Sequence, residues 1–156
     1  YKRQDPTLAW KDLDWVRTQW PWRIVLKGIM HPEDAHWARE TGMDGIVVSN
    51  HGGRQLDGAS STISRLAEIV AAAGGIEVMI DGGFRRGADI LKAIALGASG
   101  AMLGRAMAFA VAADGERGVA TLIAALAREI EVAMALMGCP DIDTLRAEGK
   151  RFLKVK

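Results

Sequence analysis

The stretch GIVVSNHGGRQLDGA, residues 45–59, decides the fold. Its apolar opening predicts a buried strand over 45–50, and the glycine-rich loop that follows carries His51 and Arg54. A histidine can take a proton near neutral pH, and an arginine can hold a carboxylate through two parallel hydrogen bonds. The loop therefore indicates chemistry on a small acid at the carboxyl end of a strand.

The rest of the chain alternates in the same way. We expect three further strands over residues 23–28, 76–83 and 100–105. We expect helices over residues 32–42, 61–73, 86–97, 105–113 and 116–137, and a short one that begins near Asp141. Apolar strands that are joined through helices by short connections predict a parallel sheet with both faces buried.

Two architectures fit four such units: an open doubly wound sheet and part of a (β/α)8 barrel. A barrel gathers its site from the carboxyl ends of successive strands. A doubly wound fold would place phosphate-binding glycines after the first strand, where this chain has GIMHPED (28–34). Polar residues lie at the carboxyl ends of all four predicted strands, at Lys27, Ser49–Arg54, Asp81–Arg86 and Gly104–Arg105. We therefore predict a barrel.

A complete barrel has eight strands and about 250 residues, whereas the 156 residues of this chain supply four strands. Four open strands would expose two sheet edges and the inner face of the barrel. We therefore expect the chain to pair with a missing N-terminal half. Within the chain we expect the end of a long loop at 1–7, four βα units over 8–138 and a C-terminal tail over 139–156.

Composition narrows the class of protein. The net charge of +1 gives no indication of a nucleic-acid partner, and the single cysteine, Cys139, excludes an internal disulfide and suits a reducing compartment. The apolar stretch 119–138 carries Arg128, Glu129 and Glu131, which favour a buried amphipathic helix over a membrane span. Five tryptophans lie in the first 37 residues; we expect core or interface packing, with a membrane-interface role as the lesser alternative.

Two glycine-rich turns predict a shared phosphate site. In MLGRA (102–106), Gly104 and Arg105 stand where a loop enters a helix, so backbone N–H groups and a guanidinium can meet an anion. In IDGGFRRG (80–87), Asp81 can accept hydrogen bonds from sugar-like hydroxyls, and the glycines let a ligand approach the backbone. The alternatives are a solvated helix start at Arg105 and a capped tight turn at Asp81.

A lysine and the loop after the second strand complete the candidate site. A lysine on an apolar strand is costly unless it is paired or functional, so Lys27 is expected to neutralise negative charge or else to extend to the rim. His51 is expected to act as a base beside the carboxylate clamp of Arg54. His31 and His36 lack such neighbours, and we expect both on the surface.

The motif SNHGGRQLD (49–57) resembles the signature of the FMN-dependent α-hydroxy-acid oxidising enzymes. This family includes glycolate oxidase, L-lactate dehydrogenases and oxidases, and (S)-mandelate dehydrogenase. The resemblance extends along nearly the whole chain, through WKDLDWVR, LKGI, PEDA, IDGGFRRGADILKAIALGA, LGRA and GCPDI. It implies an FMN-binding (β/α)8 barrel in which this chain holds strands five to eight.

The resemblance also implies a role for each candidate residue. His51 would be the active-site base, Arg54 would hold the substrate carboxylate, and Lys27 would stabilise negative charge at N1 and O2 of the reduced flavin. Ser49 would contact the flavin ring. The other cofactor contacts would be Asp81 and Arg85 on the ribityl–phosphate arm, Gly82 and Gly83 as backbone room, and Gly104 and Arg105 on the phosphate.

The implied activity is oxidation of a lactate- or mandelate-like (S)-2-hydroxy acid to the 2-keto acid, with electrons passed to FMN. Another FMN- or phosphate-binding barrel, such as an isomerase, and a non-catalytic half-barrel stay open as alternatives. The family implies a homotetramer, and some relatives carry a membrane-binding segment in the loop that would precede Tyr1. The expected location is therefore cytoplasmic, or peripheral on the cytoplasmic face of the inner membrane. The sequence names neither the hydroxy acid nor the electron acceptor.

Overall fold

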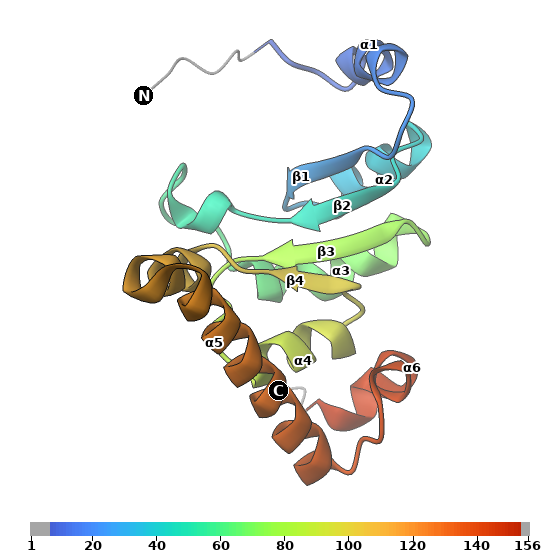
Figure 1. The fold of residues 1–156 in the computed structure, drawn as a ribbon. Helices are drawn as coiled ribbons and strands as arrows, with labels where there is room; N and C mark the ends of the chain where they lie inside the picture. Colours follow the sequence, from blue (N-terminus) through green and yellow to red (C-terminus); the bar gives the residue numbers. More distant parts are fainter. Residues whose placement is uncertain (1–6, 154–156) are drawn as a thin grey trace.

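The fold is a four-stranded parallel sheet with helices between the strands (Figure 1). The computed structural model describes residues 7–153, so the loop end expected at 1–7 lies almost entirely outside the described residues. The elements follow one another as α1 (Asp12–Gln19), β1 (Val25–Ile29), α2 (Pro32–Glu40), β2 (Gly45–Val48), η1 (His51–Gly53), α3 (Thr62–Ala73), β3 (Glu77–Asp81), α4 (Gly87–Ala95), β4 (Gly100–Met102), α5 (Arg105–Met137) and α6 (Ile142–Phe152). All four predicted strands and the predicted helices are thus present.

The strand order distinguishes the predicted barrel from the alternative, an open doubly wound sheet. The strands lie side by side in the order β1-β2-β3-β4, and every neighbouring pair is parallel. A doubly wound sheet reverses its strand order at a switch point, whereas a barrel adds each new strand next to the last. The consecutive order is therefore that of a barrel segment. All the strands end on the left side of Figure 1, where the loops after them gather.

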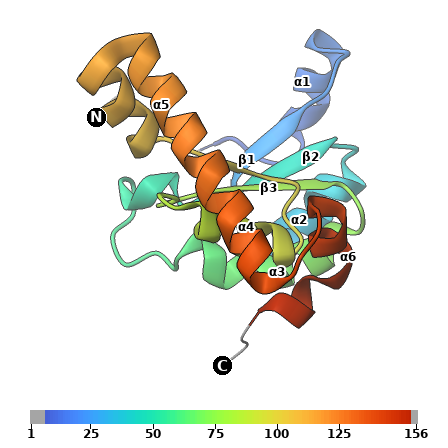
Figure 2. The same cartoon turned by 60° about the horizontal axis from the view of Figure 1, so that its bottom comes forward.

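The two faces of the sheet have different surroundings. One face, with Ile46, Val78 and Ile80, is fully or almost fully buried, and it packs on α2 and α3 within the main hydrophobic core. Helices α2, α3 and α4 all lie on one side of the sheet (Figures 1 and 2). On the other face, Val25 and Met102 at the outer strands remain 41% and 42% exposed. Burial on both faces is thus confirmed for β2 and wrong for the outer strands, because in the described chain nothing covers their inner face.

Local sequence signals set several helix ends. Pro32 begins α2 after His31, whose imidazole accepts a hydrogen bond from the backbone N–H of Glu33. Gly74 ends α3 in the left-handed conformation that favours glycine. Asp141 precedes α6 and accepts a hydrogen bond of 2.6 Å from the backbone N–H of Thr144, which lowers the pKa of the Asp141 carboxyl. The expected helix near Asp141 is therefore confirmed.

The long helix α5 contains the break that the sequence predicts. Asp114 and Gly115 leave the helical conformation, so the segments before and after them correspond to the two expected helices. Figure 2 shows the second segment crossing in front of α4. Among residues 7–153, no helix is both long and apolar enough to cross a membrane. The expectation that 119–138 is a buried helix is wrong for most of its length, because Leu126 is the only buried residue of α5 and apolar side chains such as Ile123 and Leu136 are exposed.

Helix α1 was not expected from the sequence. It is held to the start of the sheet by Arg17, whose guanidinium donates to the backbone oxygens of Trp22 and Gly42 and to the carboxylate of Asp44. Asp44 also accepts from the backbone N–H of Ile24 at 2.8 Å, and these contacts lower the pKa of the Asp44 carboxyl. One ion pair thus fixes the entry into β1.

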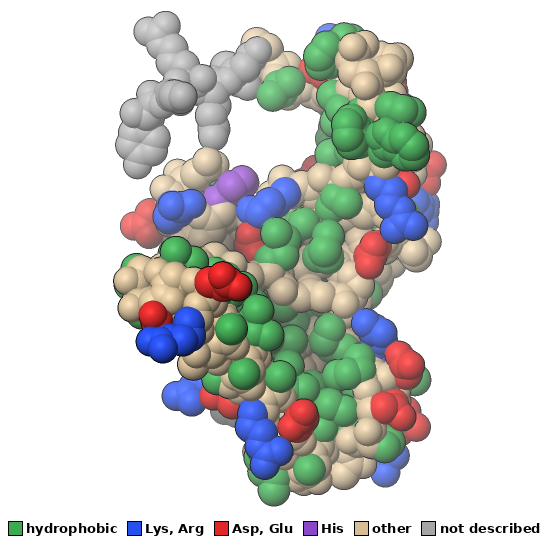
Figure 3. All heavy atoms as spheres, viewed as in Figure 1, with side chains coloured by type: hydrophobic (Ala, Val, Ile, Leu, Met, Phe, Trp, Pro, Cys, Tyr) green, Lys and Arg blue, Asp and Glu red, His purple; other side chains and the backbone are tan. Residues whose placement is uncertain are grey.

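The tryptophans lie mostly on the surface. Trp10 packs partly against the main core, but Trp15, Trp20, Trp22 and Trp37 are each more than half exposed. Hydrophobic side chains gather over α1 and the start of β1 in Figure 3. Core packing is therefore the wrong expectation for these four residues, and packing at an interface is the alternative that stays a prediction.

Helix α6 packs on α4 through a tight contact. A Cβ atom added at Gly149 would lie 2.0 Å from the backbone oxygen of Ala95, closer than any real contact allows. The buried Leu145 on α6 packs with Leu91 and Ile94 of α4 around this contact. Glycine at position 149 therefore sets how closely the two helices approach.

We predict that Gly149→Ala lowers thermal stability, because the added methyl must push backbone away from backbone; overpacking of this kind costs about 1–3 kcal/mol. The matched control is Gly100→Ala, where no atom lies within 4 Å of the added Cβ and φ is not positive. Thermal unfolding followed by circular dichroism measures both variants. Equal melting temperatures would contradict the contact.

Candidate active site

Lys27 of β1 and the segments at the ends of β2, β3 and β4 surround one cavity at the carboxyl end of the sheet. Its volume is about 620 Å³. It is lined by Lys27, His51, Gly52, Arg54, Gln55, Asp81, Gly82, Gly83, Gly104, Arg105 and Ala108. In Figure 3 a histidine flanked by basic side chains lies over the loop after β2 on this side of the molecule. Eight of the ten residues predicted for the site thus line one cavity.

The other two predicted residues, Arg85 and Ser49, lie nearby. Arg85 lines a neighbouring cavity of about 360 Å³, which shares Gly83, Gly104 and Arg105 with the first. Ser49 lines neither cavity, because its side chain is buried, with 1% of the residue exposed. Gly83, Gly104 and Arg105 therefore lie between two adjoining cavities. Arg54 lines only the first of them, and Arg85 lines only the second.

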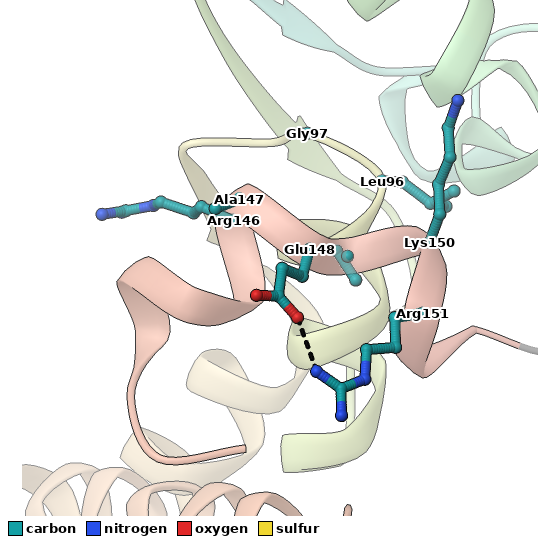
Figure 4. A pocket seen from close by; sticks show the side chains of 9 residues that line it. Leu96, Gly97, Arg146, Ala147, Glu148, Lys150 and Arg151 are labelled. Carbon is teal, nitrogen blue, oxygen red and sulfur yellow. Dashed lines mark hydrogen bonds and ion pairs between the residues drawn. The ribbon is translucent and has the colours of Figure 1, made fainter.

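A third hollow, of about 530 Å³, lies at the opposite end of the sheet between α6 and the turn that follows α4. Figure 4 shows that its charged side chains do not converge: Glu148 pairs with Arg151, while Arg146 and Lys150 point away in different directions. The chemistry predicted from the sequence has no counterpart here. The cavity at the carboxyl end is the candidate site.

Lys27 connects three strands. Its ammonium forms an ion pair of 2.9 Å with Asp81 Oδ2 and donates a hydrogen bond of 2.9 Å to Ser49 Oγ. The register explains the reach, since Lys27 is aligned with Val47 and Val47 with Met79, two residues before the end of β3. The Lys27 side chain remains 40% exposed, so the ammonium also faces the cavity.

His51 stands in a left-handed turn. His51, Gly52 and Gly53 have φ angles of 57°, 71° and 70°. Among residues 7–153, His51 is the only residue other than glycine with positive φ. A histidine in this conformation is strained by of order 1–2 kcal/mol. Glycine adopts it without steric strain, so Gly52 and Gly53 continue the turn without adding to the strain at His51. The pattern HGG in the sequence is therefore a requirement of the backbone.

The His51 ring rests against Gly28 of β1. A Cβ atom at Gly28 would lie 3.0 Å from His51 Cε1, so the ring occupies the space that a side chain would need. Arg54 is exposed, and its Nε donates a long hydrogen bond of 3.5 Å to the His51 backbone oxygen. The imidazole and the guanidinium thus leave the same short turn, and both face the cavity.

The turn after β3 is fixed from α3. Thr62 is buried, and its hydroxyl donates a 2.6 Å hydrogen bond to the backbone oxygen of Asp81. A Cβ atom at Gly82 would lie 2.7 Å from the Thr62 hydroxyl oxygen, so this hydroxyl also requires glycine next to Asp81. Sequence reasoning missed Thr62 and Gly28, and it missed Gln55 in the cavity wall. Of these three residues, only Gly28 could have been found from the sequence, because it directly follows Lys27.

The chain was compared with known proteins. A profile of the FMN-dependent dehydrogenase family matches residues 1–151. The chain belongs to this family. It is 50% identical over 144 residues to an L-lactate dehydrogenase of Pseudomonas syringae pv. syringae (strain B728a), covering 92% of this chain and 38% of that protein. It is 51% identical over 144 residues to an L-lactate oxidase of Nostoc sp. (strain PCC 7120), covering 90% of this chain and 40% of that protein.

The structures of the family confirm the fold. A mandelate oxidase solved with benzoyl-formic acid superposes with a TM-score of 0.85 at 50% identity, covering 89% of this chain and 42% of that one. The expected class is therefore confirmed: the chain is a segment of an α/β barrel of the FMN-dependent family. The chain spans about two fifths of the length of the curated relatives it matches.

We predict that Gly28→Ala displaces the His51 ring, because the new methyl would overlap Cε1. Gly42→Ala is the matched control, since Gly42 also has positive φ, at 72°, but has no atom within 4 Å of an added Cβ. Both substitutions strain the backbone, because both positions have positive φ, but only the alanine at position 28 contacts the imidazole. Nuclear magnetic resonance of the three histidines measures the effect. A His51 Hε1 signal that responds equally to both substitutions would refute the contact.

Proposed function

We propose that this chain is the C-terminal part of an FMN-dependent enzyme that oxidises an (S)-2-hydroxy acid to the 2-keto acid. The observation that carries the proposal is one cavity that combines a titratable base, His51, and a carboxylate clamp, Arg54, with the paired cation of Lys27. An FMN-dependent isomerase would need the phosphate-binding turns but not the base and the clamp together. The names of the relatives, lactate dehydrogenase, lactate oxidase and mandelate oxidase, support the same class of substrate.

The described residues fit the cofactor. Asp81 Oδ1 is buried without a hydrogen-bond partner among residues 7–153, and it is an acceptor that a ribityl hydroxyl can satisfy. Gly83 and Gly104 have no atom within 4 Å of an added Cβ, so a ligand can approach their backbone. Arg105 stands at the first residue of α5, where backbone N–H groups and the helix dipole favour a phosphate. Arg85 supplies a second cation from the adjoining cavity.

Bound FMN supplies the acceptor for the two electrons that leave the hydroxy acid. The chain's own residues bind and orient the acid: Arg54 presents its guanidinium fork to the carboxylate, which sets the carbon that bears the hydroxyl beside His51. The imidazole takes one of the two protons that the acid loses when it becomes a keto acid. Lys27 stabilises the negative charge that appears near it as electrons leave the substrate.

The proposed enzyme extends beyond this chain. We propose strands five to eight for β1–β4, with the βα units over 8–138 and a tail from 139, and a preceding half that closes the barrel on the free edges of β1 and β4. The exposed Trp15, Trp20 and Trp22 support such a partner, because aromatic side chains of this size are typical of interfaces. A homotetramer, and a cytoplasmic or peripheral membrane location, are the corresponding proposals for assembly and place.

The function is tested on a fusion in which the N-terminal region of mandelate oxidase precedes this chain in one polypeptide. We expect a yellow protein whose flavin absorption bleaches when (S)-lactate or (S)-mandelate is added without oxygen, and the faster acid identifies the better substrate. A yellow protein that neither acid bleaches would contradict the proposed reaction. A colourless protein would contradict the cofactor site.

For His51 we predict that His51→Gln in the fusion leaves flavin binding intact and slows anaerobic flavin reduction by about 10²–10⁴-fold, the usual loss when a general base is removed. Stopped-flow absorbance measures the rate. His36→Gln is the matched control, because His36 is an exposed histidine on α2, outside the cavity. Normal reduction by the His51 variant would sink the assignment of the base.

For Arg54 we predict that Arg54→Lys weakens substrate binding, because an ammonium cannot form two parallel hydrogen bonds with a carboxylate. The dissociation constant comes from the dependence of the flavin reduction rate on the concentration of the acid. Arg86→Lys makes the same exchange at an exposed arginine that pairs with Glu129 on α5, away from the cavity. An unchanged dissociation constant for Arg54→Lys would remove the clamp from the proposal.

A further inference from the structure

The buried hydroxyl of Ser49 joins two parts of the site that are far apart in the sequence. Ser49 follows β2, and its Oγ accepts a hydrogen bond of 2.9 Å from the Lys27 ammonium and one of 3.1 Å from the backbone N–H of His51. A hydroxyl oxygen has two acceptor positions, so these two donors occupy both. The oxygen is therefore fully used as an acceptor, and it lies in no cavity wall.

The bond to His51 acts at a strained residue. His51 is held at a φ of 57°, a conformation that persists only when its surroundings impose it. Three contacts restrain it directly: the Ser49 hydroxyl on its backbone N–H, the long hydrogen bond from Arg54 Nε to its backbone oxygen, and Gly28 against its ring. Other bonds close the loop without touching the His51 N–H, such as the 3.0 Å bond from the Gly53 N–H to the Asn50 backbone oxygen.

The hydrogen bond from Lys27 connects the Ser49 hydroxyl to the ion pair between Lys27 and Asp81. The ammonium has three N–H donors, of which one meets Asp81 and one meets Ser49. The third is free among the described contacts, and Lys27 lines the cavity. Any anion that draws the ammonium into the cavity must therefore change the bond between Lys27 and Ser49.

We propose that Ser49 is a positioning residue that couples the Lys27 ammonium to the backbone of His51. The hydroxyl sets the orientation of the imidazole according to where Lys27 lies, so that negative charge on a bound cofactor and the placement of the base depend on each other. The meaning of this coupling for catalysis rests on the proposed function, but the coupling itself is a property of this chain.

The test is amide hydrogen exchange of this chain, measured residue by residue by nuclear magnetic resonance. Ser49→Ala is expected to make the His51 amide exchange about 3–10-fold faster, the factor that corresponds to one net hydrogen bond. The Gly53 amide is the internal control and keeps its rate. Ser99→Ala is the matched control, since it removes another partly buried serine hydroxyl, one bonded to the Val78 backbone oxygen at the amino-terminal end of the sheet.

The coupling is tested by adding Lys27→Met. With Ser49 present, Lys27→Met is expected to accelerate His51 exchange; in the Ser49→Ala background it is expected to add nothing. Asp81→Asn, which keeps the ammonium, serves as the control for the lost ion pair. An unchanged His51 rate in Ser49→Ala, or effects of the two substitutions that simply multiply, would overturn the proposal.

If Ser49→Ala opens the whole loop, the Gly53 amide will also exchange faster and the effect on His51 will not be specific. Ser49→Thr is the variant that tests the proposal in that case. Threonine keeps the hydroxyl, so the His51 amide is expected to stay protected and to respond still to Lys27→Met. Loss of either behaviour in a folded Ser49→Thr protein would count against Ser49 as the link.

A second readout uses the fusion. Ser49→Ala is expected to slow flavin reduction at saturating acid while the dissociation constant of the acid, which Arg54 sets, stays unchanged. If the fusion with native Ser49 is yellow but inert, the proposed function fails and the exchange result still stands. If the fusion is active and the exchange shows no coupling, only the role of Ser49 fails.

Discussion

The ion pair between Lys27 and Asp81 is the contact on which the carboxyl end of the sheet depends. It crosses over β2, so it requires β1, β2 and β3 to hold their parallel register. Its worth is positional more than energetic, because partly exposed pairs contribute little free energy while loss of one partner leaves the other charge without compensation. Through Lys27 the pair reaches Ser49, and through Ser49 it reaches the strained turn of His51. The Asp81 carboxylate, the Lys27 ammonium and the turn of His51 are therefore linked by contacts between three strands.

Much of this arrangement follows from sequence patterns. Apolar runs bounded by Gly and polar residues identify the strands, and a parallel sheet brings the residues after those runs to one edge. This is why Lys27, His51 and Asp81 could be placed at one site without a structure. The glycines after His51 were also informative, since only glycine follows a left-handed residue through such a turn without cost.

The remainder depends on contacts that no local pattern encodes. Thr62 and Asp81 are 19 residues apart, and the pairing of Lys27 with Asp81 links strands that are not neighbours. Helix α1 carries only a weak apolar period, and it is held by the Arg17–Asp44 pair rather than by a buried face. The exposure of Trp15, Trp20, Trp22 and Trp37 could not be predicted either, because the size and apolar character of a tryptophan favour burial whether or not this chain supplies a surface to cover it.

The tight contact between Gly149 and Ala95 lies at the amino-terminal end of the sheet, opposite the cavity. Substitutions in the loops that line the cavity therefore do not touch the packing of α6 on α4, and the reverse is also true. For evolution this separation means that specificity can drift in the loops while stability is selected elsewhere. A family in which lactate- and mandelate-oxidising enzymes share half their residues with one short chain has the architecture that such independent drift requires.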